Sequence, residues 1–195
     1  ACSCGETSAT CASDCGATTV PANACATGAQ SRDGCGNARI ISRSAAASGW
    51  SSGSQNTCSA NDRHSGDSSC PSFDVGGDHT YAIYVRAGEH VTATLGTAST
   101  TRCTSGSTEE FHSYLKMKFN PSTSASGATS CPSAVLCAGG PARGNTWTTA
   151  RTYDATTDGW LFIIVDGGAT AFMEDRGYYT LAVQLAGCAT STCGC

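Results

Sequence analysis

Cysteine is the residue type whose number and spacing say most about the chemistry of this chain. Fourteen cysteines occur among 195 residues, against only two lysines, Lys116 and Lys118. An even number spread over the whole length predicts a framework of up to seven disulfides, which persists only in an oxidising compartment. We therefore expect a secreted protein whose paired residues are Cys2, Cys4, Cys11, Cys15, Cys25, Cys35, Cys58, Cys70, Cys103, Cys131, Cys137, Cys188, Cys193 and Cys195.

The closely spaced cysteines at the two ends of the sequence admit a second interpretation. Cys2-Ser3-Cys4 and Cys193-Gly194-Cys195 could in principle bind zinc. Thiolate zinc sites usually use C-x-x-C pairs and a reducing location, however. Disulfides are the preferred interpretation, and no cofactor is required.

A serine nucleophile and a histidine metal site are both disfavoured. Gly49-Trp50-Ser51-Ser52-Gly53 satisfies the G-x-S-x-G pattern, but that motif needs a strand before the serine and a helix after it. Neither is expected here, and serine and glycine are abundant enough for a chance match. The histidines are scattered without H-E-x-x-H spacing, at His64, His79, His90 and His112. We predict that the chain is not an enzyme.

Acidic residues gather in the turns around the Trp160 segment and are candidates for calcium binding. Calcium takes six to eight oxygen ligands and often uses such loops in extracellular domains. Our preferred ligands are Asp166, Glu174 and Asp175. The alternative is that Asp-Gly pairs simply make turns.

Three tyrosines alternate with the residues expected to face the core. Tyr84, Tyr114 and Tyr178 would then form an exposed aromatic surface that could bind a glycan or another polymer. Alternatively, another subunit or the cysteine-rich segment covers them, since residues 1–57 need something to pack on.

The residues that would position these groups lie on β-strands. Alternation over 79–86 places Tyr81, Ile83 and Val85 on one face, and 91–95 repeats the period after a turn at 87–89, so we predict a hairpin. Two further segments alternate, at 111–119 and 178–185. In the first, Leu115, Met117 and Phe119 should point inward and His112, Tyr114, Lys116 and Lys118 outward; in the second, Tyr179, Leu181, Val183 and Leu185 point inward.

Segment 159–165 differs because it is apolar on both faces. Seven residues with β-branched and aromatic members suit a central strand that is covered on both sides. No helical window of comparable quality appears. Short strands separated by Gly/Ser/Thr-rich turns predict an all-β fold, an antiparallel β-sandwich rich in disulfides.

These strand segments resemble the bacterial pre-peptidase C-terminal (PPC) domain. The resemblance rests on Gly76-Gly77-Asp78-His79-Thr80-Tyr81 with residues 86–95, on Asp158-Gly159-Trp160 through Gly167, and on 177–183. It implies a jelly-roll-like sandwich and a domain that binds or targets on behalf of a secreted hydrolase. The large cysteine complement departs from that family.

A second resemblance concerns the first fifteen or so residues. Cys2-Ser3-Cys4-Gly5-Glu6-Thr7 with Cys11 to Gly16 is similar to cysteine-rich modules of myxobacterial surface proteins. Such modules imply disulfide pairing but no activity. We therefore divide the chain into a Cys-rich segment (1–37), a β-sandwich domain (38–188) and a Cys-containing tail (189–195).

The composition of the chain limits the classes of partner that it is expected to bind. Charged residues make up 13% of the chain, the net charge is −4, and no run of like charge occurs, so neither nucleic acid nor an anionic membrane is an evident partner. No apolar run approaches the length that crosses a bilayer.

We expect a secreted or cell-surface structural or adhesive module that associates with copies of itself, with Ile40-Ile41-Ser42-Arg43 as the strand donated to a neighbour. The alternative is a PPC-type domain that recognises a polymer or glycan.

Overall fold

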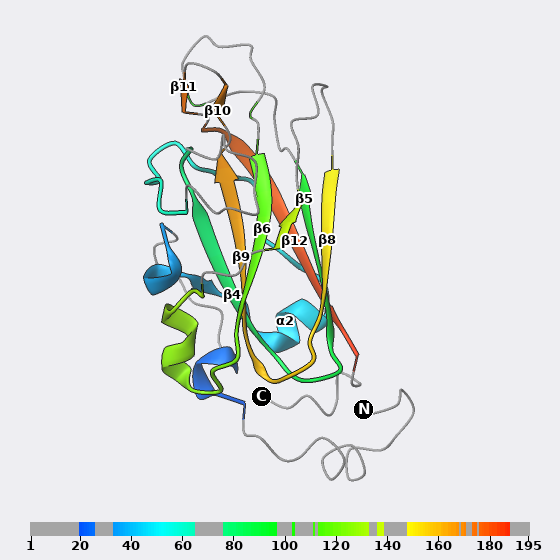
Figure 1. The fold of residues 1–195 in the computed structure, drawn as a ribbon. Helices are drawn as coiled ribbons and strands as arrows, with labels where there is room; N and C mark the ends of the chain where they lie inside the picture. The colour runs from blue at the N-terminus through cyan, green and yellow to red at the C-terminus, as the bar shows by residue number, and fades with distance from the viewer. Residues whose placement is uncertain are drawn as a thin grey trace, which may run out of the picture.

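The structure is a computed structural model that describes residues 20–25, 33–64, 76–96, 103, 111, 113–132, 136–138, 148–167, 169–170, 173–174 and 176–187. Two five-stranded sheets face each other in these residues (Figure 1). Across the first sheet the order is β1 (Arg39–Ile40), β4 (His79–Val85), β9 (Gly159–Gly167), β6 (Ser113–Asn120) and β7 (Leu136–Ala138). The second contains β2 (Trp50–Ser51), β12 (Tyr178–Ala186), β5 (His90–Gly96) and β8 (Thr148–Asp154), with β3 (Gln55–Asn56) also on β12.

Short elements complete the described fold. A small hairpin joins β10 (Ala169–Thr170) to β11 (Met173–Glu174). The helical turns are η1 (Ala22–Cys25), η2 (Cys35–Asn37), α2 (Arg43–Ala47) and η3 (Ala125–Thr129). Every pairing in the two large sheets is antiparallel except that of β1 with β4. The predicted all-β, disulfide-containing fold is thereby confirmed.

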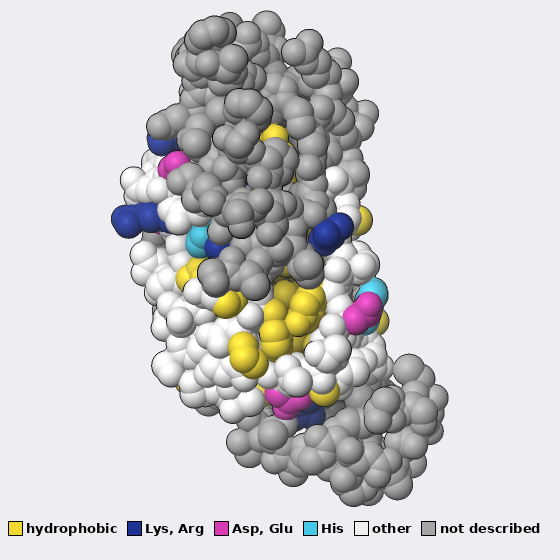
Figure 2. All heavy atoms as spheres, in the orientation of Figure 1, with side chains coloured by type: hydrophobic (Ala, Val, Ile, Leu, Met, Phe, Trp, Pro, Cys, Tyr) yellow, Lys and Arg dark blue, Asp and Glu magenta, His cyan; other side chains and the backbone are white. Residues whose placement is uncertain are grey.

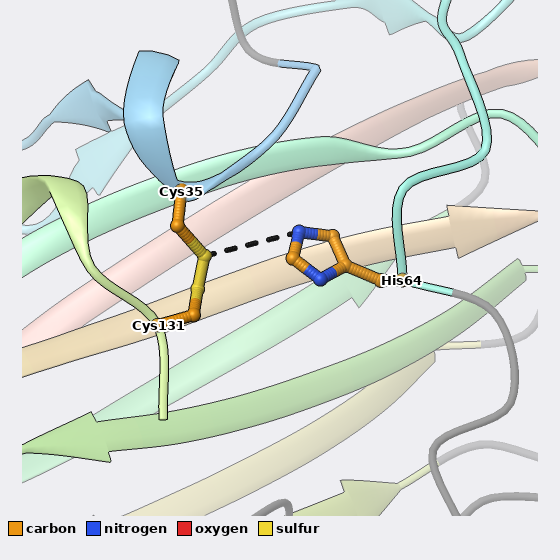
Figure 3. Close-up of side chains that lie close together, drawn as sticks. All are labelled: Cys35, His64 and Cys131. Carbon is orange, nitrogen blue, oxygen red and sulfur yellow. Dashed lines mark hydrogen bonds between the residues drawn. A yellow bond between two sulfur atoms is a disulfide. The ribbon is translucent and has the colours of Figure 1, made fainter. Parts of the chain in front are cut away.

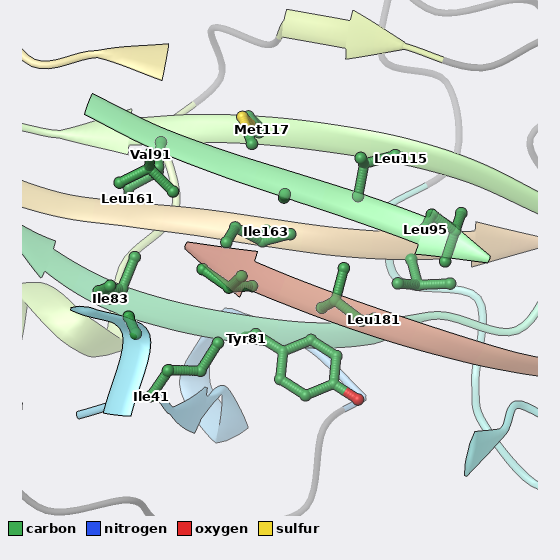
Figure 4. Close-up of a cluster of buried hydrophobic side chains, with 14 of the residues drawn as sticks. Ile41, Tyr81, Ile83, Val91, Leu95, Leu115, Met117, Leu161, Ile163 and Leu181 are labelled. Carbon is green, nitrogen blue, oxygen red and sulfur yellow. The ribbon is translucent and has the colours of Figure 1, made fainter. Parts of the chain in front are cut away.

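The main core lies between the two sheets and is built by the alternating residues of each strand. The side chains predicted to point inward from residues 79–86, 111–119 and 178–185 all pack in it (Figure 4). Those most deeply buried include Tyr81, Ile83, Leu115, Met117, Tyr179 and Leu181. Because β12 is buried at every second residue, its other face is free to be polar.

Strand β9 is the central strand of its sheet, and both of its faces are covered. Leu161, Ile163 and Val165 enter the core between the sheets, whereas Trp160 and Phe162 enter a second cluster on the outer face. All nine residues of β9 are buried. The central position predicted for segment 159–165 is confirmed.

Segments from the first third of the chain cover the outer face of the first sheet. Ala24, Cys35 and Ala38 are buried there against Tyr84 and Trp160, whose rings make an edge contact with centroids 5.4 Å apart. These segments hold little apolar surface of their own, so their burial depends on the sheet beneath them. The outward-facing side chains of β4 and β6 are consequently not exposed.

The predicted hairpin between residues 79–86 and 91–95 is wrong. Strand β4 pairs with β9, whereas β5 pairs with β12 and β8, so the turn carries the chain from one sheet to the other. Glu89 in that turn is fully buried and forms a double hydrogen bond with the guanidinium of Arg43. Arg43 also donates to the Tyr84 carbonyl, and the backbone N–H of Arg86 donates to Glu89. This buried ion pair fixes the crossover.

The segment proposed as a donor strand is already used within the chain. Arg39 and Ile40 pair in parallel with Tyr81 and Ala82, and Ile41 is completely buried in the main core. Helix α2 follows at once, capped by Ser42, whose hydroxyl accepts a hydrogen bond from Ala45 N. The expected donor segment is therefore the edge of its own sheet.

Candidate functional site

A disulfide beside a buried histidine lies at the centre of the candidate site. Cys35 at the start of η2 is bonded to Cys131, which follows η3, with 5.5 Å between the Cα atoms. His64 Nε2 lies 3.9 Å from Cys35 Sγ (Figure 3) and 3.1 Å from the Thr80 hydroxyl. The three side chains are close enough to surround a metal ion. Because the two sulfurs are joined, neither is a thiolate, and the oxidised chain does not offer that ligand set.

An open groove of about 720 Å³ runs beside this disulfide. Residues 33–37 and 129–132 form two of its walls, and Arg63, His64 and Lys118 contribute the basic side chains. Arg63 is exposed, while His64 and Lys118 are buried. Gly34 lies next to the Arg63 side chain, since a Cβ added at Gly34 would be 3.7 Å from Arg63 Cγ, an ordinary van der Waals contact. Polar and basic groups thus line a concave surface.

The loop that carries Arg63 and His64 is held from below by a buried carboxyl group. Asp78 Oδ2 accepts hydrogen bonds from the backbone N–H groups of Arg63, at 2.5 Å, and His64, at 2.7 Å. Lys116 Nζ donates to the His64 carbonyl at 2.7 Å. Gly77 is required beside them, because a Cβ there would lie 2.8 Å from the Thr57 carbonyl oxygen. The groove therefore has a fixed wall.

Three ionisable side chains meet beneath that wall. Lys116 Nζ contacts Asp166 Oδ2 directly, and both side chains are fully buried. The carboxyl group of Asp78 is a neighbour of Asp166. Burial raises the pKa of Asp166 to about 10, and the neighbouring Asp78 carboxyl adds to that rise. Burial also raises the pKa of Asp78 above its usual range, against the hydrogen bonds that it accepts. Burial therefore favours the protonated form of Asp166 at neutral pH.

The three residues proposed for calcium are not described as a group. Asp166 is completely buried against the Lys116 side chain instead of lying in an open turn. Glu174 lies on β11 in a region where side chains are not described, and Asp175 is outside the described residues. Calcium binding therefore stays a prediction.

The expected exposed tyrosine surface is wrong for two of its three members. Tyr84 is 0% exposed and Tyr114 is 4% exposed, while Tyr178 is half-buried. Lys116 and Lys118 share the outer face of β6 and are also buried. The strands alternate as predicted, but segments of the first third of the chain cover Tyr84 on the outer face, in line with the alternative interpretation.

Two of the predicted disulfides are described. Besides Cys35 with Cys131, Cys58 is bonded to Cys103, with 5.3 Å between the Cα atoms. Cys25 and Cys137 lie on η1 and β7, without described side chains. The remaining cysteines, Cys2, Cys4, Cys11, Cys15, Cys70, Cys188, Cys193 and Cys195, are outside the described residues together with most of the predicted segments 1–37 and 189–195.

Ser51 lies where a catalytic serine is not expected. It ends the two-residue strand β2, and the chain continues into strand β3 instead of a helix. Arg63, Asp78 and Lys116 were not singled out from the sequence. The one local signal was a lysine between apolar neighbours on a strand, which is equally typical of a surface position.

Comparison with known proteins adds little to this description. Neither a protein-family model nor a curated protein sequence matches the chain. Among solved structures, the periplasmic g-type lysozyme inhibitor PliG of Aeromonas hydrophila is similar over 71% of this chain and 84% of its own, at 15% identity and a TM-score of 0.33. That similarity is too low to carry an inference, and the PPC resemblance stays a prediction.

The fold and the site together define an all-β, disulfide-linked sandwich. Its two described disulfides are typical of an extracellular or periplasmic protein. Within the described residues, no helix is long and apolar enough to span a bilayer.

Proposed function

We propose that this protein is a non-catalytic structural or adhesive module of a secreted or cell-surface assembly, in which copies of the chain contact one another. The observation that carries the proposal is an unpaired strand edge on the side of the sandwich where β6 and β8 lie. Among the described strands β8 pairs only with β5, which leaves the other edge of a seven-residue strand without a described partner. Such an edge can accept a strand from a neighbouring molecule.

Apolar surface at the same side supports this contact. Phe119 on β6 stacks on Tyr153 on β8 with ring centroids 5.2 Å apart, and both residues are only partly buried. Hydrophobic side chains gather on this face of the described surface, where charged side chains are few (Figure 2). A second copy would bury this surface and complete the β8 edge together.

The interior of the module is suited to a load-bearing role. Its buried polar contacts join segments that are far apart in sequence: the Cys35–Cys131 disulfide spans 96 residues, and the Arg43–Glu89 pair spans 46. The disulfide fastens the cover of the first sheet and the ion pair fastens the turn between the two sheets, which supports a structural role.

Charge placed on the β8 edge tests the proposed association. Ala150 and Thr152 are exposed on this strand, so Ala150→Glu with Thr152→Glu would set like charges against each other in an antiparallel pair of copies. We expect the unaltered chain to grow in size with concentration and the variant to stay monomeric, measured by light scattering.

A matched control carries the same charges on a strand that is paired on both sides. Ala182→Glu with Ala186→Glu places two carboxylates on the exposed positions of β12, which should leave association unchanged. An unaltered chain that is monomeric at every concentration would contradict the proposal.

A second candidate function is the binding of an extracellular polymer, and the groove beside Cys35–Cys131 is the observation that favours it. The groove is concave, its wall is fixed by Asp78, and Arg63 and Lys118 line it. Two cations against the single carboxylate of Asp33 favour an acidic polymer over a neutral one.

A further inference from the structure

The buried group of Lys116, Asp166 and Asp78 is arranged for a covalent reaction. Lys116 lies on β6, Asp166 on β9, and Asp78 immediately before β4, so the three residues sit on adjacent strands of one sheet (Figure 1). Tyr114 pairs with Asp166 and Lys116 with Ile164, which makes Lys116 and Asp166 diagonal neighbours on the same face. Asp78 precedes His79, the partner of Val165, and therefore lies beside Asp166.

The site is fully buried, and Lys116 Nζ already lies against the Asp166 carboxyl group. All three residues are 0% exposed. Lys116 Nζ contacts an oxygen of the Asp166 carboxyl group and is also held by the His64 carbonyl. Holding an amine against a carboxyl group in this way replaces a bimolecular encounter, and effective molarities of about 10⁵ M or more are known for well-oriented groups.

We propose that Lys116 and Asp166 join in an intramolecular isopeptide bond, an amide between Nζ and Cγ, and that Asp78 carries the proton that the reaction has to move. This inference does not rest on the proposed assembly. It assigns to Asp78 a positioning and proton-transfer role, and to Lys116 and Asp166 the bond itself.

The step balances without any further reactant. Asp78 takes one proton from the Lys116 ammonium, and the freed nitrogen lone pair attacks Cγ of the protonated Asp166. The Nζ–Cγ bond forms, and the bond from Cγ to the hydroxyl oxygen breaks. That oxygen leaves as water with its own hydrogen and one from nitrogen. The amide keeps one N–H hydrogen and Asp78 keeps its proton, so the site is neutral before and after.

The surroundings favour each stage of this reaction. Because burial raises the pKa of Asp166, its carboxyl group is in the acid form that an amine can attack. Burial raises the pKa of Asp78 as well, which suits a group that ends the reaction protonated. A buried amide replaces an ammonium and a carboxylate, and the uncompensated burial of such charges is costly. Release of the water molecule from this buried site then opposes the reverse reaction.

The mass of the protein tests the proposal. The protein is purified with its disulfides intact, and its mass is measured after these have been reduced and alkylated. We expect a mass lower than the sequence mass by one water molecule, and a branched tryptic peptide in which Lys116 is joined to Asp166. Because the chain has only two lysines, the assignment is unambiguous. A mass equal to that of the sequence, or a water loss that maps elsewhere, would overturn the proposal and leave a plain ion pair.

Three variants assign the roles. Lys116→Arg keeps the cation but cannot form the amide, so the mass deficit should vanish, whereas Lys118→Arg should retain it in full. Asp78→Asn can still accept the two backbone N–H groups but cannot take the proton, and we expect most of this variant to lack the bond. A full deficit in Asp78→Asn would overturn the proton-transfer role. Near-ultraviolet circular dichroism checks that each variant is folded. If Lys116→Arg does not fold, the proposal is decided by the mass of the unaltered protein and by the mass of the Asp78→Asn variant.

Discussion

Arg63 and His64 owe their position to groups that lie beneath them rather than to their own contacts. Asp78 accepts both of their backbone N–H groups, and Lys116 binds the His64 carbonyl. This part of the molecule thus combines a structural role for buried residues with a binding role for exposed ones. The buried acids and lysine hold a loop in place, and the exposed side of that loop forms the groove.

The Arg63 side chain is where polymer binding is tested. Arg63→Gln should weaken binding of the acidic polysaccharide polygalacturonate about two- to fivefold, the size of an exposed charge contact, and added salt should remove the difference. Titration calorimetry measures both effects. Arg151→Gln on β8 is the control with the same loss of charge, and neutral dextran is the control ligand. Equal weakening by the two variants would contradict a role for the groove.

At the scale of elements, β9 carries the largest share of the packing. It lies between β4 and β6, and its side chains enter both the core between the sheets and the cluster on the outer face. A strand that is apolar on both faces gains stability only where both faces are covered. The first third of the chain and the second sheet supply the two covers.

Truncating one outer-face side chain of β9 tests that cover. Phe162→Ala should lower the free energy of unfolding by about 3–5 kcal/mol, since Phe162 is fully buried and leaves a cavity. Phe119→Ala, at the partly buried end of β6, should cost clearly less. Urea denaturation of the two variants provides the comparison. Equal losses of stability in the two variants would mean that the cover on the outer face packs Phe162 no better than the partly open surface packs Phe119.

At the scale of the whole molecule, a disulfide helps to hold the first third of the chain, which has little apolar surface of its own, to the rest of the protein. Residues 33–37 pack on the first sheet and are bonded to the rest of the molecule through the Cys35–Cys131 disulfide. The loop that this bond closes is about twice as long as that of Cys58–Cys103, with separations of 96 and 45 residues. The chain-entropy account of disulfides predicts a larger contribution from the longer loop.

Removal of the longer bridge should release the cover over the first sheet. Cys35→Ser with Cys131→Ser should cost about 2–5 kcal/mol of stability and expose residues 33–37 to proteases, while a chelator should have no effect on the unaltered protein. Limited proteolysis with and without reductant measures both. Protection that survives full reduction would show that packing holds this segment, and destabilisation by the chelator would indicate a bound metal.

The sequence by itself determined the strands and their inward faces. Alternation placed Tyr81, Leu115 and Leu181 in the core, and an apolar run of seven residues identified the central strand. These features are local, because each strand must present apolar residues at every second position to whatever covers it. Cysteine number likewise predicted the disulfides without their pairing.

Only the tertiary structure decided which strands pair and which surfaces stay open. Strands β4 and β5 look like a hairpin locally, yet the buried contact of Glu89 with Arg43 sends them to different sheets. Tyr84 and Lys116 occupy positions typical of an exposed face, and segments distant in sequence cover them. The group of Lys116, Asp166 and Asp78 comes from two strands, β6 and β9, and from the residue that precedes a third, β4. Its chemistry arises from burial and mutual distance, and no local pattern of residues encodes either quantity.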